Sequence, residues 1–269
     1  VLQNSEPAEL VCVPREAVGV EGSSIYLKEG EHLTVEELLY GLMLQSGNDA
    51  AVALAMHVGG SVDAFLQKMN QVAEAAGAVN SHFATPNGLH DDTHYTTARD
   101  LANITRAALQ NEAFQTIVST KSKTISNEFG EHDRVLVNKN KLLKLFDGAD
   151  GVKTGFTKKA GRCFVGSATR NGMQLICVVL RCGPMFEDTS SLLTKAFDTY
   201  RLSSVLPRRY YVLKGEDRYA TNVGFSYPCT EVEHEELHLQ ANFEGQTPKL
   251  QVFLHNDLIF STELYKINS

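Results

Sequence analysis

The strongest hydrophobic pattern in the chain predicts two consecutive helices with a short polar break between them. Thr34 and Glu37 have the spacing of a capping box, and apolar residues follow them at helical spacing to about Leu44. Residues 50–58 are apolar on nearly every side, which is typical of a helix in the centre of a domain. The residues 45–49 that separate the two helices should therefore lie deep in the fold.

Helical patterns alternate with strand patterns through the first two hundred residues. We expect helices at 62–76, 97–110 and 186–203, strands within 1–33, 121–137 and 151–157, and a hairpin of 161–169 with 173–181 on the turn Asn171-Gly172. Because helices dominate the early part and the sheet is formed late, the pattern predicts an α+β domain with helices packed on an antiparallel sheet.

The pattern changes after Pro207, where short strands such as residues 250–254 replace the helices. We therefore expect two domains, a larger one at 1–206 and a small β-rich one at 207–269. About sixty residues form only a marginal core, so the second domain should depend on a neighbour for stability.

Composition and charge exclude several classes of protein. The 269 residues are 43% hydrophobic and 21% charged, with a formal net charge of -7 and no basic stripe, so we do not expect a nucleic-acid partner. The longest apolar runs, 50–56 and 175–180, are too short to span a bilayer. Five cysteines are too few for a disulfide scaffold, and we expect free thiols.

The polar break contains the first candidate for chemistry, Ser46-Gly47-Asn48. In one interpretation Asn48 or Asp49 caps the second helix and Ser46 satisfies a free carbonyl. In the other, the hydroxyl and the carboxamide both point into a cleft, where they can exchange protons and hold a peptide group.

The second candidate is the strand 151–157, which carries Lys153-Thr154-Gly155. Glycine weakens a strand interior, and two glycines within five residues indicate close approach of another backbone. A ligand could then pair with the strand edge while Lys153 and Thr154 bind an anionic group such as a carboxylate. The simpler interpretation is a glycine-rich edge strand with a solvent-exposed lysine.

These two tripeptides together resemble the second and third motifs of the penicillin-binding proteins and serine β-lactamases. Three longer segments are similar to the low-molecular-mass D-alanyl-D-alanine carboxypeptidases: Leu33 to Ala55, Phe83 to Leu101 and Gly151 to Thr169. The resemblance extends from about Ala17 to about Leu206. It implies a penicillin-binding protein/serine β-lactamase-like fold, and many members of that family carry a small β-rich C-terminal domain.

The resemblance also implies an activity, the removal of the terminal D-alanine from peptidoglycan stem peptides through an acyl-enzyme. Ser46 would pass a proton to the leaving amine and Asn48 would hold the acyl-side amide. Lys153 and Thr154 would bind the terminal carboxylate, and Gly155 would leave room for the substrate. No cofactor and no metal are implied, and β-lactams would act as covalent inhibitors.

The nucleophilic serine and its lysine belong to a first motif, S-x-x-K, that the chain does not contain. By the family's order of motifs it should precede Val1. The resemblance further implies an extracytoplasmic protein of cell-wall synthesis and cell shape, with membrane attachment through a C-terminal segment beyond this chain. Three alternatives stay open: a non-catalytic peptidoglycan-binding homologue, a D,D-endopeptidase and a β-lactamase. The class A glutamate segment, E-x-x-L-N, is absent between Asn48 and Lys153.

One further motif points elsewhere, because residues 234–238 match the zinc-protease pattern H-E-x-x-H. That chemistry needs a helix that presents His234 and His238 to one metal ion. The flanking residues read as a charged strand, so we do not expect a zinc site here.

Overall fold

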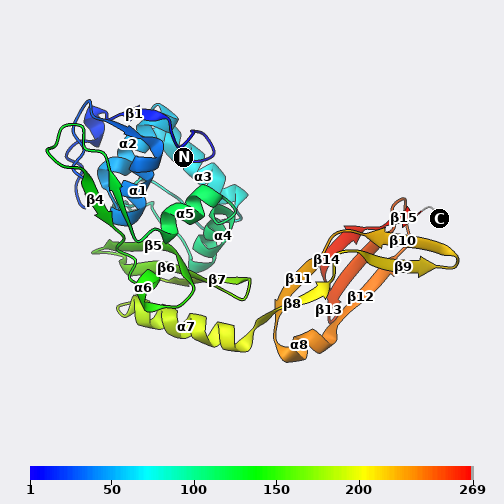
Figure 1. Ribbon diagram of the computed structural model, residues 1–269. Coiled ribbons are helices and arrows are strands. Elements are labelled where there is room, and N and C mark those ends of the chain that lie inside the picture. Colours follow the sequence, from blue (N-terminus) through cyan, green and yellow to red (C-terminus); the bar gives the residue numbers. More distant parts are fainter. Residues whose placement is uncertain (268–269) are drawn as a thin grey trace. The chain divides into compact units, whose positions relative to one another are not determined.

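The computed structural model describes residues 1–267 and divides the chain into two compact units. The first unit comprises residues 1–169 and 174–193, and the second comprises residues 170–173 and the chain from Thr194 onward (Figure 1). This division falls about a dozen residues before the boundary that we expected at Pro207.

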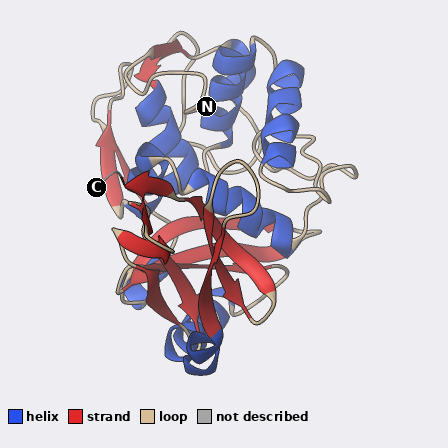
Figure 2. Ribbon diagram, turned by 90° about the vertical axis from the view of Figure 1, so that its right-hand side faces the viewer, coloured by secondary structure: helices blue, strands red, loops and turns tan. Residues whose placement is uncertain are grey.

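The first unit combines helices with small antiparallel sheets (Figure 2). Its helices are α1 (Val35–Gln45), α2 (Asn48–Gly59), α3 (Val62–Ala75), α4 (Ala98–Ala108), α5 (Glu112–Ser119), α6 (Leu142–Leu145), the start of α7 (Met185–Thr199) and a short 3-10 helix, η1 (Arg15–Ala17). Its strands are β1 (Leu10–Cys12) paired with β2 (His32–Thr34), β3 (Ser122–Ile125) paired with β4 (Arg134–Val137), and the sheet of β5 (Ala149–Thr157), β6 (Gly161–Arg170) and β7 (Met173–Val179). The predicted α+β class is confirmed.

The centre of the unit is the helix pair α1 and α2, as the hydrophobic pattern predicted. Thr34 accepts the backbone N–H of Glu37, and the Glu37 carboxylate accepts the backbone N–H of Thr34, which completes the capping box. The first eight residues of α2 are buried, and both helices contribute to one hydrophobic cluster of buried residues. Two buried helices therefore meet at the polar break.

The sheet of β5, β6 and β7 places β5 at its edge. In the register of β5 with β6, Lys153 lies opposite Val165, Gly155 opposite Cys163 and Phe156 opposite Arg162. Helices α5 and α6 pack against β5. Among the described residues the other edge of β5 pairs with no strand, so its backbone groups stay available for a ligand.

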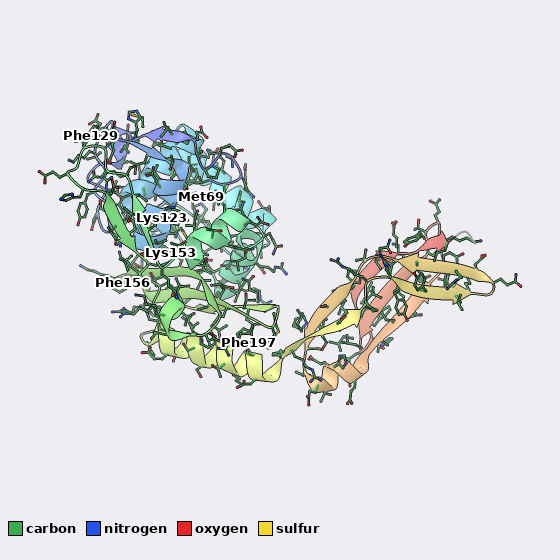
Figure 3. The ribbon with its side chains drawn as sticks, in the orientation of Figure 1. Met69, Lys123, Phe129, Lys153, Phe156 and Phe197 are labelled. Carbon is green, nitrogen blue, oxygen red and sulfur yellow. The ribbon has the colours of Figure 1, made fainter. Side chains whose placement is uncertain are left out.

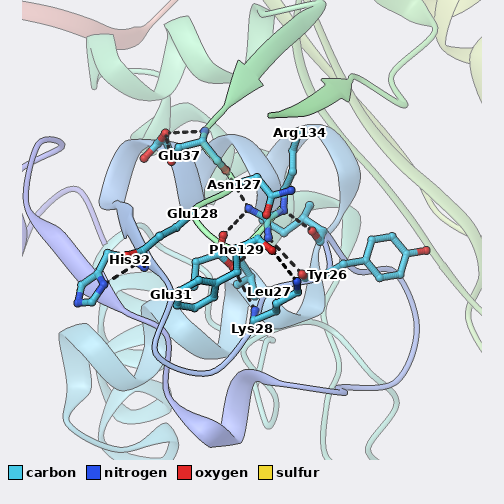
Figure 4. Close-up of polar contacts among 12 residues, drawn as sticks. Tyr26, Leu27, Lys28, Glu31, His32, Glu37, Asn127, Glu128, Phe129 and Arg134 are labelled. Atoms are coloured by element: carbon cyan, nitrogen blue, oxygen red, sulfur yellow. Dashed lines mark hydrogen bonds and ion pairs between the residues drawn. The ribbon is translucent and has the colours of Figure 1, made fainter. Parts of the chain in front are cut away.

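A buried ion pair ties the hairpin of β3 and β4 to the segment that precedes β2 (Figure 4). The Arg134 guanidinium donates two hydrogen bonds to the Glu31 carboxylate, at 2.6 and 2.9 Å, and Glu31 has no solvent exposure. Arg134 also donates to the backbone oxygens of Ile25, Tyr26 and Ser126. These contacts hold residues 25–31, a segment without regular secondary structure, in one conformation.

The second unit is mainly β-structure around Leu206, Leu250 and Leu264. Its elements are β8 (Arg201–Leu206), β9 (Tyr210–Lys214), β10 (Asp217–Thr221), β11 (Phe225–Cys229), α8 (Glu231–Glu236), β12 (Leu237–Asn242), β13 (Lys249–Leu254), β14 (Asp257–Glu263) and β15 (Tyr265–Ile267).

The predicted helix 186–203 was too long. Helix α7 ends at Thr199, and β8 follows at once and pairs with β11. The pairing of β8 with β11 shows that residues 201–206 belong to the second unit.

The prediction of a strand around the H-E-x-x-H pattern was wrong in its first half. Thr230 and Glu233 form a capping box that starts helix α8, so His234 lies in a helix. The chain becomes β12 at Leu237, where the His238 ring stacks on Phe253. The two histidines therefore lie on different elements, and not on one helix as the zinc-protease pattern requires.

Within the described residues no single helix has the length and apolar content needed to cross a membrane. Helices α2 and α3 meet that test only as a pair, and they are bent by 88° at their junction.

We predict that Arg134→Ala lowers the free energy of unfolding by about 3–5 kcal/mol, because it leaves the buried Glu31 carboxylate without a positively charged partner and with only the backbone N–H of Lys28, at 3.1 Å. Chemical denaturation measures this change. Arg15→Ala is the matched control, since Arg15 pairs with Glu29 at 3.8 Å on the exposed surface and should change stability by less than about 0.5 kcal/mol. Equal effects of the two substitutions would show that the buried pair does not stabilise the fold.

Candidate active site

A cavity of about 600 Å³ opens in the first unit between the polar break and the edge of β5. Its walls come from segments that are far apart in the sequence. They include Gly22, Ser23, Leu42, Ser46, Asn48, Asn87, Gly88, Leu89, Lys139, Lys141, Lys153, Thr154, Gly155, Phe156, Thr157, Arg162, Met185 and Phe186.

Ser46 lies where α1 ends. Its backbone is in the left-handed region, with φ 58° and ψ 41°, and its N–H donates to the Gly41 carbonyl as the last bond of the helix. A non-glycine residue in this region costs about 1–2 kcal/mol. The surrounding core enforces the conformation, which turns the chain sharply between two buried helices and leaves the Ser46 side chain on the cavity wall.

Asn48 is the first residue of α2 and is nearly buried. Its backbone N–H donates to the Ser23 carbonyl at 2.7 Å, and its side-chain nitrogen donates to the Glu21 carbonyl at 2.6 Å. Both bonds hold Asn48 against the segment around Gly22. A carboxamide has a second N–H and an oxygen acceptor, which remain for a ligand in the cavity.

Asp49, the next residue, has a structural task. Its buried carboxylate accepts hydrogen bonds from the Ser24 hydroxyl at 2.5 Å and from the backbone N–H groups of Ile25 and Leu27. Three donors from an irregular segment thus converge on one carboxylate at the start of α2. The capping interpretation of the polar break is not observed, because Gly47 is the N-cap of α2 and no side chain caps the helix. Asp49 instead holds residues 24–27, while Ser46 and Asn48 line the cavity.

Lys153 lies on β5 (Figure 3), and its side chain lines the cavity. Its ammonium donates to the Ser46 hydroxyl at 2.5 Å and to the Thr154 carbonyl at 2.8 Å. Burial, and to a smaller extent the nearby positive charge of Lys139, together lower the pKa of Lys153 to about 8. Lys153 is therefore mainly protonated at pH 7 and loses its charge as the pH rises through about 8.

Lys139 is a cavity residue that the sequence analysis missed. Its ammonium donates to the Gln45 carbonyl at 2.6 Å and to the Ser23 hydroxyl at 3.1 Å, so it bridges the end of α1 to the segment around Gly22. Burial lowers the pKa of Lys139 as well. It lies in a loop rich in lysine and asparagine, where no periodicity distinguishes one lysine from another.

Gly155 is not required by the packing of the protein itself. A Cβ at this position would meet only Cys163, at the ordinary contact distance of 3.9 Å. The position is exposed at the edge of β5 and lines the cavity. A side chain here would project where an extended ligand would lie along the strand.

The structure thus brings Ser46, Asn48, Lys153, Thr154 and Gly155 to one cavity, and the convergence that we predicted is observed. Their catalytic and binding roles stay predictions. Besides Lys139, the sequence analysis also missed the contributions of segment 22–23, Arg162 and residues 185–186.

Comparison with solved structures defines the class of the fold. Penicillin binding protein 5 from Haemophilus influenzae superposes with a TM-score of 0.77 at 27% sequence identity, over 98% of this chain and 83% of that one. The penicillin-binding protein fold that the motifs implied is confirmed.

Sequence comparison defines the family. A family model described as D-alanyl-D-alanine carboxypeptidase matches residues 6–183, so the chain belongs to this family. The carboxypeptidase DacF of Bacillus subtilis is 36% identical over 201 residues, which is 74% of this chain and 51% of DacF. DacB2 of Mycobacterium tuberculosis is 38% identical over 180 residues, 64% of this chain and 61% of DacB2. The chain spans about half to three fifths of the length of these relatives.

We predict that Lys139→Gln raises the pKa of Lys153 above about 8, because it removes the neighbouring positive charge. The rise should be partial, since burial is the larger cause of the lowering. An NMR titration of ¹³C-labelled lysine side chains measures it. Lys144→Gln, an equal charge change outside the cavity, should leave the value unchanged. An unaltered pKa in Lys139→Gln would mean that the two ammonium groups do not interact.

We predict that Gly22→Ala disturbs Asn48. Gly22 has φ +97°, and a Cβ there would lie 2.7 Å from the Asn48 side-chain nitrogen. Gly19→Ala is the control, because Gly19 also has a positive φ, +76°, but open space around it. Each substitution should cost about 1–2 kcal/mol of backbone strain. Gly22→Ala should destabilise the fold by more than this strain and should displace the Asn48 amide in a crystal structure. Equal destabilisation by the two substitutions, with Asn48 unmoved, would contradict this prediction.

Proposed function

We propose that the full-length protein is a serine-type D-Ala-D-Ala carboxypeptidase that removes the terminal D-alanine from peptidoglycan stem pentapeptides through an acyl-enzyme. The observation that carries the proposal is the contact of 2.5 Å between the Lys153 ammonium and the Ser46 hydroxyl, inside a cavity that Asn48, Thr154 and Gly155 also line. Membership in the carboxypeptidase family supports it.

Substrate recognition begins at the terminal carboxylate. The Lys153 ammonium has three N–H donors, and Ser46 and the Thr154 carbonyl use two of them. The third donor and the Thr154 hydroxyl are available for the carboxylate. A free C-terminal carboxylate is the group that distinguishes the substrate of a carboxypeptidase from an internal peptide bond.

Proton transfer is the role of Ser46. In this proposal the nucleophilic serine and its lysine belong to an S-x-x-K segment that precedes Val1. The serine gives its proton to that lysine as it attacks the penultimate D-alanine carbonyl. Ser46 passes a proton on to the amine of the departing D-alanine, and it receives one in turn from the lysine. Its contact with Lys153 keeps the hydroxyl oriented as an acceptor, so its own O–H points to the reaction.

The edge of β5 and Asn48 hold the rest of the peptide. An extended chain added to the free edge can exchange backbone hydrogen bonds with β5, and Gly155 leaves space for it. Asn48 then binds the amide on the acyl side of the scissile bond. This arrangement runs the substrate antiparallel to β5, with its C-terminus at Thr154.

The proposal includes inhibition by β-lactams, which mimic the terminal dipeptide, and a site of action at the outer face of the cytoplasmic membrane, where peptidoglycan lies. The cavity needs no cofactor for this chemistry. Two alternatives, a D,D-endopeptidase and a β-lactamase, would use the same cavity residues on other substrates. A non-catalytic protein would bind the peptide through these residues without hydrolysing it.

We predict that Lys153→Ala lowers kcat/KM on a peptide that ends in D-Ala-D-Ala with a free carboxylate. The fall should correspond to a loss of several kcal/mol of transition-state stabilisation. A charge-assisted contact contributes about 1.5–3 kcal/mol, and the substrate carboxylate that is left without its charged partner adds a desolvation cost. On the C-terminally amidated peptide the loss should be much smaller, because only the orientation of Ser46 is then affected. Kinetics of the full-length enzyme on both peptides measure the difference.

Lys153→Arg serves as the control that keeps the charge, and it should restore part of the activity, since the planar guanidinium fits poorly where a compact ammonium lies. Equal losses on the two peptides would remove carboxylate recognition from Lys153. Binding of both peptides with no turnover of either by the wild-type protein would favour the non-catalytic alternative.

A further inference from the structure

The charges around the cavity are all of one sign. Four of its lining side chains are cationic, and none is acidic: Lys139, Lys141, Lys153 and Arg162. Among the described residues none of the four forms an ion pair. In a protein with a formal net charge of -7, an unbalanced cationic cavity indicates an anionic ligand. One terminal carboxylate balances only one of these charges.

Two of the four cations already donate hydrogen bonds within the protein. Lys153 is bound to Ser46, and Lys139 bridges Gln45 and Ser23. Lys141 and Arg162 are both exposed, and within residues 1–267 neither side chain forms a hydrogen bond or an ion pair. Of these two, Arg162 lies on the sheet, beside the strand that carries Lys153 and Thr154. The Arg162 guanidinium keeps its full donor capacity for a ligand.

The register of the sheet shows which part of a bound peptide Arg162 would meet. Arg162 lies opposite Phe156, so the two side chains share one face, and Thr154 lies on that face two residues earlier. Two residues of strand span about 6.6 Å. If the terminal carboxylate binds at Thr154, the residue that precedes the two D-alanines lies level with Arg162 or slightly beyond it.

The distance across the sheet also suits a contact. Arg162 is on β6, one strand away from β5, and the peptide would lie on the other side of β5. The two strand spacings amount to about 10 Å. A long arginine side chain that lines the cavity and an extended acidic side chain can together span this gap. Phe156, Met185 and Phe186 line the same cavity and reduce the solvent around such a contact.

We propose that Arg162 binds a carboxylate on the residue immediately before the D-Ala-D-Ala terminus, and so makes the site selective for peptides with a free acid at that side chain. The inference rests on the proposed function for the placement of the terminal carboxylate. It adds that amidation of the upstream carboxylate weakens recognition of the peptide, although the scissile bond is unchanged.

The test compares N-acetyl-L-Glu-D-Ala-D-Ala with the isosteric N-acetyl-L-Gln-D-Ala-D-Ala. For the full-length wild-type protein, kcat/KM and the affinity measured by calorimetry should favour the Glu peptide by about fivefold at low salt, the upper end for a solvent-accessible ion pair. The preference should shrink as salt is added. Arg162→Gln should bring the ratio to about one by weakening the Glu peptide alone, and Arg162→Lys should keep part of it.

Lys158→Gln is the matched control, because Lys158 is an exposed cation four residues before Arg162 that does not line the cavity. It should keep the wild-type ratio. Equal affinities of the wild-type protein for the two peptides, or an unchanged ratio in Arg162→Gln, would overturn the proposal. Failure to hydrolyse either peptide would instead overturn the proposed function, and the calorimetric ratio would still decide the role of Arg162.

Discussion

The contact between Lys153 and Ser46 joins the two halves of the site. It connects the edge of the sheet to the junction of the two most buried helices, across more than a hundred residues of sequence. The cavity exists because these elements meet there, and every other lining group takes its place relative to this pair. Burial explains most of the chemical value of this contact. Together with the charge of Lys139 it lowers the pKa of Lys153 to about 8, so the ammonium is still charged at neutral pH but gives up a proton far more readily than an exposed lysine.

Several neighbouring features keep that contact in place. Three features fix the polar break against the segment that starts at Gly22. They are the left-handed conformation of Ser46, the carboxylate of Asp49 and the missing side chain at Gly22. Glu31 and Arg134 extend the support to the hairpin of β3 and β4. The wall opposite β5 therefore consists largely of irregular chain, but buried carboxylates satisfy its backbone groups as a helix or sheet would.

The sequence predicted the elements that follow simple periodicities and the residues that form recognisable motifs. The capping box of α1, the apolar helix α2 and the positions of Ser46, Asn48 and Lys153 were all visible in this way. Lys139 and Arg162 were not, because they become cavity residues only through the register of β5 with β6 and the fold of the loop after β4. The short helix α8 was missed since its capping box precedes a charged segment with no apolar face.

The unpaired edge of β5 is also a place where a second copy of the chain could add a strand, as exposed edges commonly do. The composition of this edge opposes that event. Two copies whose β5 strands paired antiparallel about Lys153 would bring the Lys153 side chain of each near that of the other. Gly155 offers no side chain to a partner strand. The same edge that we propose as the peptide-binding strand thus disfavours self-association through its charge, without being covered by another element.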